Sequence, residues 1–246
     1  MNEAVFEKMV ASVGRRVTLD QADRDALFAL RFSTRALPPQ SYLVREGEIS
    51  LRSCSYVVSG LAFRHKLTAD GRRQIVSIRV PGDFLDLQHL FLDMADHNIQ
   101  ALTALEVIDI NRKDLQDLVL SRPTIARAIW IETLVEASIL REWVLNVGRR
   151  DGHGRIAHLL CEFAERMQEA GTDLHAGFHL PITQEQLGDA VGLTSVHVNR
   201  MMKLLVSEGV IAFDRRHIKI LDWERLRSAG DFSSLYLHLG QQRRAS

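Results

Sequence analysis

Five side chains suited to contacting nucleic acid lie at helical spacing between positions 195 and 203: Ser195, Val196, Asn199, Arg200 and Lys203. Ser195, Asn199 and Lys203 repeat every four residues, and Val196 and Arg200 each follow one of them, so a helix brings all five to one side. Arginine can form two hydrogen bonds with a guanine and asparagine two with an adenine, whereas lysine suits a phosphate. The pattern predicts a helix face that reads the edges of DNA base pairs.

The other side of the same predicted helix is apolar. Its buried stripe is expected at three- and four-residue steps, at Val198, Met201, Met202 and Leu205. A polar face that is merely solvated is the commoner meaning of such a pattern. The flanking residues favour DNA binding here, because they predict a first helix, a tight turn and a hairpin around this face.

A short helix and a tight turn are predicted immediately before this face. Thr183 can cap the first helix, and Gln186 lies three residues on, where its side chain can reach back to the cap amide. Gly192 suits a left-handed turn, and Thr194 can cap the second helix. This order is that of a helix-turn-helix, whose second helix enters the major groove of DNA.

A short β-hairpin is predicted directly after the second helix. Three apolar residues between 210 and 213 precede a polar turn, and Ile218 and Ile220 alternate with Lys219 after it. Arg215 and Arg216 lie at the predicted tip, where basic groups can neutralise phosphates and release counterions. The hairpin completes a winged helix-turn-helix. The predicted DNA-binding residues are Thr183, Gln184, Thr194, Ser195, Val196, His197, Asn199, Arg200, Lys203, Arg215 and Arg216.

Three features carry a resemblance to a known family: Gly192-Leu193-Thr194, Val198-Asn199-Arg200 and the hairpin that follows. In these the chain resembles the Crp/Fnr superfamily of bacterial transcription regulators, and the resemblance spans nearly the whole chain. It implies an α+β fold with an N-terminal jelly-roll-like β-roll similar to cyclic-nucleotide-binding domains, a long dimerisation helix and a C-terminal winged helix-turn-helix. It also implies a homodimer on pseudo-palindromic double-stranded DNA, with RNA polymerase and an unidentified small-molecule effector as further candidate partners.

The resemblance also assigns the base contacts. In the family, the second helix reads its half-site through the positions that match Ser195, Val196, Asn199 and Arg200, and Arg200 is implied to contact a guanine. The position of Val196 usually carries a glutamate that accepts a hydrogen bond from cytosine. Valine cannot accept one and favours a thymine methyl instead. We therefore expect a half-site that differs from those of the best-known members.

The N-terminal half alternates short β-type runs with turn signals between residues 37 and 114. Glycines at 47, 60, 71 and 82 punctuate it at intervals suited to short antiparallel strands. The clearest strands are residues 56–58 and 74–78, and Thr68-Ala69-Asp70-Gly71 suits a hairpin turn. Regular short strands favour a jelly-roll or a similar β-sandwich. An amphipathic helix is predicted before them, at residues 21–30.

The residues of a cyclic-nucleotide site are predicted to be lost. In nucleotide-binding relatives a Gly-Glu pair and a later Arg-Ser or Arg-Thr pair hold the phosphate, whereas the matching positions here carry Asp86-Leu87 and residues 96–100, which lack arginine. Aspartates at 83, 86, 93 and 96 would repel an anion, with only His89 and His97 to offset them. Leu140-Arg141 stands where a Thr-Ser pair would contact the base. We therefore expect no response to cyclic AMP.

No cofactor and no metal site are predicted. An iron–sulfur cluster needs about four thiolates, and the chain has 2 cysteines, Cys54 and Cys161, both in predicted core segments. Haem needs an axial ligand, and the histidines at 65, 89 and 97 are interpreted instead as polar residues of a strand surface, a loop or a helix. Two alternatives stay open: a regulator gated by haem or another small ligand in the β-roll, and a ligand-binding protein without DNA function.

A long helix is predicted at residues 124–146, with Pro123 at its start. Its apolar residues cover more than one face, so it needs two partners, which we expect to be its own β-roll and a second copy of the chain. Burial of this helix in a single core is the alternative. The residues assigned to the dimer helix are Ile125, Ile131, Leu134, Val135 and Ile139.

A hinge is predicted after this helix, because glycines stand at 148, 152 and 154 and allow bending. Asp151 is expected to cap a further helix that begins near Arg155. The chain is thus divided into a sensor β-roll at residues 1–122, a dimerisation helix and hinge at 123–150, and a DNA-binding domain at 151–246.

Composition fits this division and argues against other classes. The chain has 246 residues, 46% of them hydrophobic, which is enough for two modest cores. Its 31 basic and 31 acidic residues cancel, so a DNA-binding surface must come from local clustering. No apolar run reaches membrane-spanning length and the N-terminus lacks a signal-peptide pattern, so a cytoplasmic protein with reduced cysteines is expected. No nucleophile motif, Walker-type phosphate loop or zinc-protease helix is found, and we do not expect an enzyme.

Overall fold

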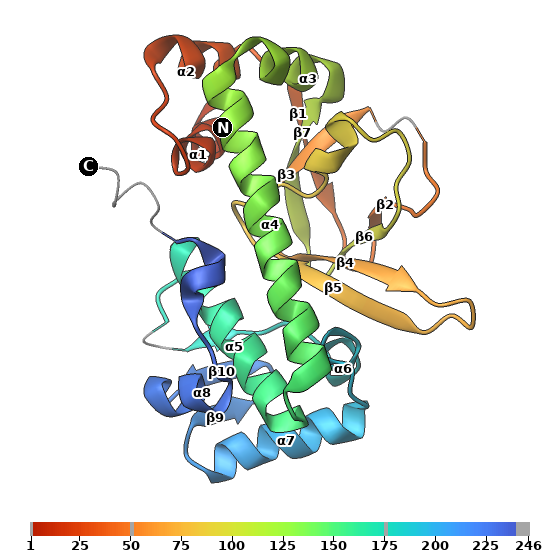
Figure 1. Ribbon diagram of the computed structural model, residues 1–246, viewed down its shortest axis with the longest axis vertical. Coiled ribbons are helices and arrows are strands. Elements are labelled where there is room, and N and C mark those ends of the chain that lie inside the picture. The colour runs from red at the N-terminus through yellow and green to blue at the C-terminus, as the bar shows by residue number, and fades with distance from the viewer. Residues whose placement is uncertain (1, 50–51, 175–176, 240–246) are drawn as a thin grey trace. The chain divides into compact units, whose positions relative to one another are not determined.

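The computed structural model describes residues 2–49, 52–174 and 177–239, with side chains from Phe6 onward. The chain divides into two compact units, one made of residues 1–64, 78–137 and 238–246 and the other of residues 65–77 and 138–237. The first unit carries a β-roll and the second a winged helix-turn-helix (Figure 1). The long helix α4 (Pro123–Arg149) contributes residues to both.

Two sheets form the β-roll, with strand orders β1-β7-β3 and β2-β6-β4-β5. The strands are β1 (Phe32–Leu37), β2 (Tyr42–Val44), β3 (Ser53–Ser59), β4 (Ala62–Leu67), β5 (Arg73–Arg79), β6 (Asn98–Ala101) and β7 (Leu105–Asn111). The helical elements of this part are α1 (Asn2–Gly14), α2 (Gln21–Phe28), the 3-10 turn η1 (Leu87–Leu90) and α3 (Arg112–Ser121). This arrangement confirms the predicted α+β fold with an N-terminal β-roll.

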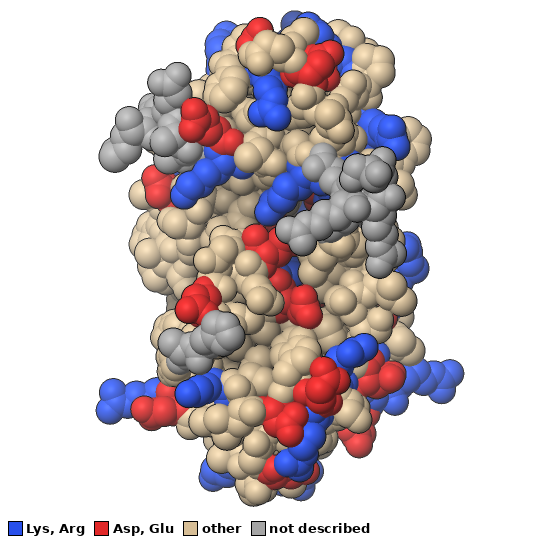
Figure 2. Space-filling model, turned by 90° about the vertical axis from the view of Figure 1, so that its left-hand side faces the viewer, with Lys and Arg blue, Asp and Glu red and all other residues tan. Residues whose placement is uncertain are grey.

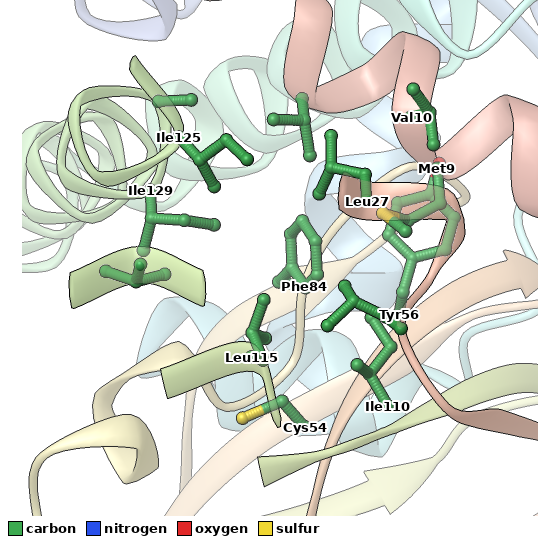
Figure 3. Close-up of a cluster of buried hydrophobic side chains, with 14 of the residues drawn as sticks. Met9, Val10, Leu27, Cys54, Tyr56, Phe84, Ile110, Leu115, Ile125 and Ile129 are labelled. Carbon is green, nitrogen blue, oxygen red and sulfur yellow. The ribbon is translucent and has the colours of Figure 1, made fainter. Parts of the chain in front are cut away.

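Strand β7 shows why the roll has two cores. Side chains alternate across a strand, and Leu105 and Val107 are buried in one apolar cluster whereas Ile108 and Ile110 are buried in the other. The second cluster also contains side chains of α1, α2, α3 and α4, so these helices cover one face of the sheet β1-β7-β3 (Figure 3). The start of α4 is therefore an integral part of the β-roll core.

Local signals placed several elements correctly. The predicted turn at 68–71 is confirmed, since the Gly71 N–H donates to the Thr68 carbonyl at 2.9 Å and Gly71 has a φ of +82°, a conformation that glycine adopts without steric cost. The helix predicted at 21–30 is α2, which begins after an Asp20 cap and ends at Phe28. Helix α1 was not predicted, and its buried residues Phe6 and Met9 belong to the same core as α2.

The second unit contains α5 (Gly152–Glu169), β8 (Phe178–His179), α6 (Gln184–Val191), α7 (Ser195–Ser207), β9 (Ile211–Asp214), β10 (His217–Ile220), α8 (Trp223–Ala229) and the 3-10 turn η2 (Ser234–Leu237). Its sheet has the order β8-β10-β9, with antiparallel pairing throughout. Helix α5 packs against α6, α7 and α8 through a buried apolar stripe that includes Ile156, Leu160 and Phe163. The winged helix-turn-helix is thus built on α5.

The segment predicted as a hinge differs from expectation. Helix α5 begins at Gly152 rather than near Arg155, because Asp151 accepts from the Gly154 N–H at 2.8 Å and caps it there. Gly148 lies in α4, while Gly152 and Gly154 lie inside α5. A Cβ atom on Gly152 would come within 2.9 Å of His197 Nε2. The glycine at 152 therefore permits close packing, which the sequence interpretation did not consider.

Candidate nucleic-acid interface

The helix-turn-helix is held by hydrogen bonds at both helix starts. The Thr183 hydroxyl accepts from the Gln186 N–H at 3.1 Å, and the Gln186 side chain accepts from the Thr183 N–H at 2.9 Å. Gly192 adopts the left-handed conformation at φ +67°, and the Thr194 hydroxyl accepts from the His197 N–H at 3.3 Å. The predicted capping box, turn and second cap are all confirmed, so the start of α7 is fixed by local interactions.

The two faces of α7 differ as the spacing predicted. Val198, Met201, Met202 and Leu205 are buried. Ser195, Val196, Arg200 and Lys203 are exposed, and Asn199 and His197 are half-buried. Val196 is 79% exposed at the start of α7, so its apolar side chain is accessible to a partner. Helix α7 therefore offers a mixed apolar, amide and cationic surface over its first two turns.

Arg200 has a partner on its own helix. Its Nη2 donates to His197 Nε2 at 3.1 Å, because a guanidinium has donors only. His197 in turn lies against the backbone of Gly152 at the start of α5. The arginine that the family resemblance assigns to guanine is thus tethered at one nitrogen, and its other donors stay available.

The remaining predicted DNA-binding residues lie on helix α6 and in the turn of the β9-β10 hairpin, which forms the wing. Thr183 is exposed and Gln184 half-buried at the start of α6, and the Thr183 hydroxyl keeps a proton to donate although its oxygen accepts from Gln186. Arg215 and Arg216 form the two-residue turn between β9 and β10, and both are exposed. The wing is tied back at Arg216, whose carbonyl accepts from the Leu180 N–H at 2.7 Å. Both basic side chains therefore project from an ordered turn.

Charge is distributed locally rather than broadly. On the face that Figure 2 shows, Lys and Arg side chains are interspersed with Asp and Glu. This pattern agrees with the zero net charge of the chain. A broad field of one sign would attract any polyanion, and the face in Figure 2 carries none.

The interior of the β-roll corrects the sequence interpretation. His65, His89 and His97 are 1%, 1% and 4% exposed, so the prediction that His65 lies on a strand surface was wrong. His89 lies in η1 and His97 in the loop before β6, as predicted, but both rings are buried. Burial lowers the pKa of His97 to about 4, with Arg64 adding to the effect. The burial of these rings depends on residues that are distant in the sequence. The pattern of residues within a single strand does not reveal such packing. In residues 2–49, 52–174 and 177–239, no group of three or more His, Cys, Asp or Glu side chains is arranged to hold a metal ion.

Two buried arginines in the β-roll were not identified from the sequence. Arg64 of β4 and Arg79 of β5 both form ion pairs with Glu136 of α4, and Arg64 Nη2 also donates to the Leu85 carbonyl at 2.7 Å. The expectation that only His89 and His97 offset the acidic residues was therefore wrong. The single carboxylate of Glu136 pairs with both guanidinium groups and compensates one of their two positive charges.

Asp86 lies in the same interior and is 2% exposed, with its carboxylate accepting from the Ser55 N–H at 2.9 Å. Burial raises the pKa of Asp86 to about 7, although the Ser55 hydrogen bond and Arg64 oppose the shift. An unfolded aspartate titrates near pKa ~3.9. Between these two values the folded chain keeps a proton that the unfolded chain has lost, so this group makes the chain less stable as the pH rises.

The variant Asp86→Asn is therefore expected to gain stability relative to the parent chain as the pH rises from about 4 to about 7, by up to about 1.4 kcal/mol per pH unit. Asparagine keeps an oxygen that can accept from Ser55 but does not titrate. Urea unfolding of both proteins across this window measures the difference. A difference in unfolding free energy that stays constant with pH would contradict the assignment.

The dimer-helix prediction needs a correction. Ile125 and Val135 are 0% and 5% exposed and belong to the interior of the chain itself, so they are not available to a second copy. Ile131 and Ile139 are half-buried, and Leu134 is exposed. The exposed apolar residues of α4 are Trp130, Leu134, Leu140, Val144 and Leu145. Helical spacing brings these five to one broad side of α4.

The described helices include none that is long and apolar enough to cross a membrane. A β-roll, a long helix with an exposed apolar side and a winged helix-turn-helix together define a class of protein, a DNA-binding regulator with an N-terminal sensor-type domain. Sequence and structure comparisons agree with this class. A model of the Crp-like helix-turn-helix domain matches residues 154–229, and a model of the cyclic nucleotide-binding domain matches residues 34–122.

Individual relatives cover most of the chain. It is 33% identical over 184 residues to the transcriptional activator protein FnrL of Cereibacter sphaeroides, spanning 72% of this chain and 73% of FnrL. It is 30% identical over 193 residues to the nitrogen fixation regulation protein FixK of Rhizobium meliloti, spanning 77% and 83%. The solved structure of FixK2 from Bradyrhizobium japonicum is similar with a TM-score of 0.76 at 25% identity, covering 83% of this chain and 100% of that one. The chain belongs to the Crp/Fnr family of transcription regulators.

Proposed function

We propose that this regulator binds a pseudo-palindromic operator as a homodimer, with one α7 helix reading each half-site. The observation that carries the proposal is the exposed face of α7, where Ser195, Val196 and Arg200 project over a fully buried apolar stripe. Base edges in the major groove offer partners for each of these types, namely hydrogen-bonding groups and the thymine methyl. Lys203, Arg215 and Arg216 are suited to the flanking phosphates.

Dimerisation is proposed through the exposed apolar side of α4, defined by Trp130, Leu134, Leu140, Val144 and Leu145. Five large apolar side chains on one helix form a seam that a second α4 would cover. A twofold dimer places two identical reading helices about 34 Å apart, one turn of DNA, so the operator repeats the symmetry of the protein.

We also propose that cyclic AMP is not the effector. A cyclic nucleotide brings a phosphate that needs compensating cations. The two arginines inside the roll already share the carboxylate of Glu136, and Asp86 adds a further carboxyl group to the same interior. An anionic ligand would have to compete with Glu136 for the Nη groups of both arginines.

The test is selection of duplexes from a randomised pool with the full chain, followed by sedimentation of the protein alone and with the selected duplex. The expected result is enrichment of an inverted repeat bound by two chains. Enrichment should not change when cyclic AMP is added. Recovery of duplexes without a common sequence, or binding by a single chain, would refute the proposal.

Arg200→Ala is expected to weaken binding to the selected duplex by about 1–3 kcal/mol and to relax the preference at one position of each half-site. Lys203→Ala is the matched control on the same exposed face, because loss of a phosphate contact should weaken selected and random duplexes alike. Fluorescence anisotropy with both duplexes measures the two dissociation constants. Equal losses on both duplexes for Arg200→Ala would show that Arg200 does not read a base.

A further inference from the structure

The tether between Arg200 and His197 has a consequence for specificity. Both residues lie on α7, three positions apart, and the donor–acceptor distance from Arg200 Nη2 to His197 Nε2 is 3.1 Å. Because the guanidinium only donates, Nε2 is the unprotonated nitrogen of a neutral imidazole. One hydrogen of Nη2 is used by this bond, and the remaining hydrogens of the guanidinium are free to point outward.

The imidazole itself has little freedom. His197 is half-buried, and a Cβ atom added at Gly152 would lie 2.9 Å from its Nε2 and 3.3 Å from its Cε1. A Cβ atom at the first residue of α5 would therefore meet the end of the ring, and the glycine there leaves the ring its present position. The backbone of His197 is fixed as well, since its N–H donates to the Thr194 cap at 3.3 Å.

Arg200, by contrast, is exposed. A free arginine side chain has considerable rotamer entropy, part of which is lost when it docks on a base. A fixed acceptor that already holds one nitrogen reduces this loss and sets the plane of the guanidinium. Guanine has two acceptors in the major groove, O6 and N7, and a guanidinium held in the right plane can donate to both.

We propose that His197 is a positioning residue for base recognition, which orients Arg200 toward its guanine through the bond at Nη2. The inference rests on the proposed function of α7. It predicts that His197 contributes to the discrimination between bases, while it contributes nothing to binding through phosphates. Gly152 contributes indirectly, by leaving room for the ring.

The experiment compares His197→Ala, His197→Gln, Arg200→Ala and the double variant of His197→Ala with Arg200→Ala. The probes are the selected duplex and the same duplex with the guanine read by Arg200 replaced. Discrimination is the ratio of the two dissociation constants. His197→Ala is expected to reduce this ratio about tenfold, the effect of one hydrogen bond to a charged group. His197→Gln should recover most of it, because glutamine supplies an acceptor oxygen.

The double variant separates positioning from a direct contact. If His197 acts through Arg200, then His197→Ala has no further effect on discrimination once Arg200→Ala is present. Additive effects, an unchanged ratio in His197→Ala, or an equal loss on random duplexes would overturn the inference. The proposed function fails differently, since it requires Arg200→Ala alone to reduce discrimination.

Discussion

Replacing Glu136 with glutamine is expected to lower the free energy of unfolding of the chain by about 3 kcal/mol. The variant leaves Arg64 and Arg79 facing each other without a carboxylate between them. The side chains of these arginines are 14% and 8% exposed, so water cannot replace the lost charge. An uncompensated buried cation is among the most destabilising defects that one substitution can create.

The electrostatics of the site support this expectation. Burial alone would raise the pKa of Glu136, but Arg79 and Arg64 together hold it below its usual value. The pKa of Arg64 is lowered to about 10 by burial and by Arg79, so Arg64 is charged at neutral pH. The lower end of the usual range for broken buried pairs is appropriate, because 27% of the Glu136 side chain is still exposed.

A matched control lies one turn earlier on the same helix. Glu132 is 28% exposed at its side chain and pairs with a single arginine, Arg16, at 2.9 Å. Glu132→Gln should therefore cost about 1 kcal/mol. Urea unfolding gives the free energies, and hydrogen exchange at the amides of β4 and β5 shows whether the β-roll is the part that opens. Equal losses of unfolding free energy for Glu132→Gln and Glu136→Gln would mean that repulsion between Arg64 and Arg79 does not add to the cost of losing Glu136.

The parts that were predicted well from the sequence are those set by neighbouring residues. The Thr183 and Gln186 capping box, the left-handed Gly192 and the Thr194 cap each depend on side chains within four positions. The two faces of α7 follow from helical periodicity alone. These local rules act in the unfolded chain as well as in the folded one, which is why a linear pattern reveals them.

The interior of the β-roll depends on contacts between distant residues. Arg79 and Glu136 are 57 positions apart, and no spacing rule joins them. His65 had a usable signal, because it stands two positions after Phe63 on β4 and side chains two apart share a strand face. Both residues are 1% exposed. The polar character of histidine was given more weight than this alternation.

Helix α4 shows a different limit. Its apolar pattern predicts two covered sides, and one of them is buried in the core of the chain itself. Periodicity does not say which side that core takes. The core takes Ile125 and Val135, and the side left exposed includes Trp130 and Val144. The choice between the two sides of α4 for the proposed dimer contact therefore requires three-dimensional packing.

Glycines posed the hardest ambiguity, because the same residue type serves conformational freedom and close approach. The sequence interpretation gave Gly152 a hinge role, whereas in the structure it lies against His197. Gly188 was given no role at all. It lies within helix α6, so its local sequence context gives no reason for a glycine. The reason is the close approach of the Leu193 carbonyl oxygen.

Gly188→Ala is expected to destabilise the DNA-binding unit by about 2–3 kcal/mol and to weaken binding to the selected duplex by about 30-fold or more. A Cβ atom at this position would lie 2.3 Å from the Leu193 carbonyl oxygen, a separation that backbone atoms cannot tolerate. The Leu193 N–H also donates to the Gly188 carbonyl at 3.0 Å, so the turn cannot move away without losing this bond. Leu193 precedes the Thr194 cap, and any shift of the turn moves the start of α7 and its reading face.

Gly148→Ala is the matched control for helix propensity. Gly148 lies in α4, and a Cβ atom there would meet nothing within 4 Å among the described residues. This substitution should stabilise the chain by up to about 1 kcal/mol, since alanine favours a helix over glycine, and should leave the dissociation constant unchanged. Thermal unfolding and anisotropy titrations measure both effects. If Gly188→Ala bound and unfolded as Gly148→Ala does, then the close contact between α6 and the turn would not determine where α7 sits.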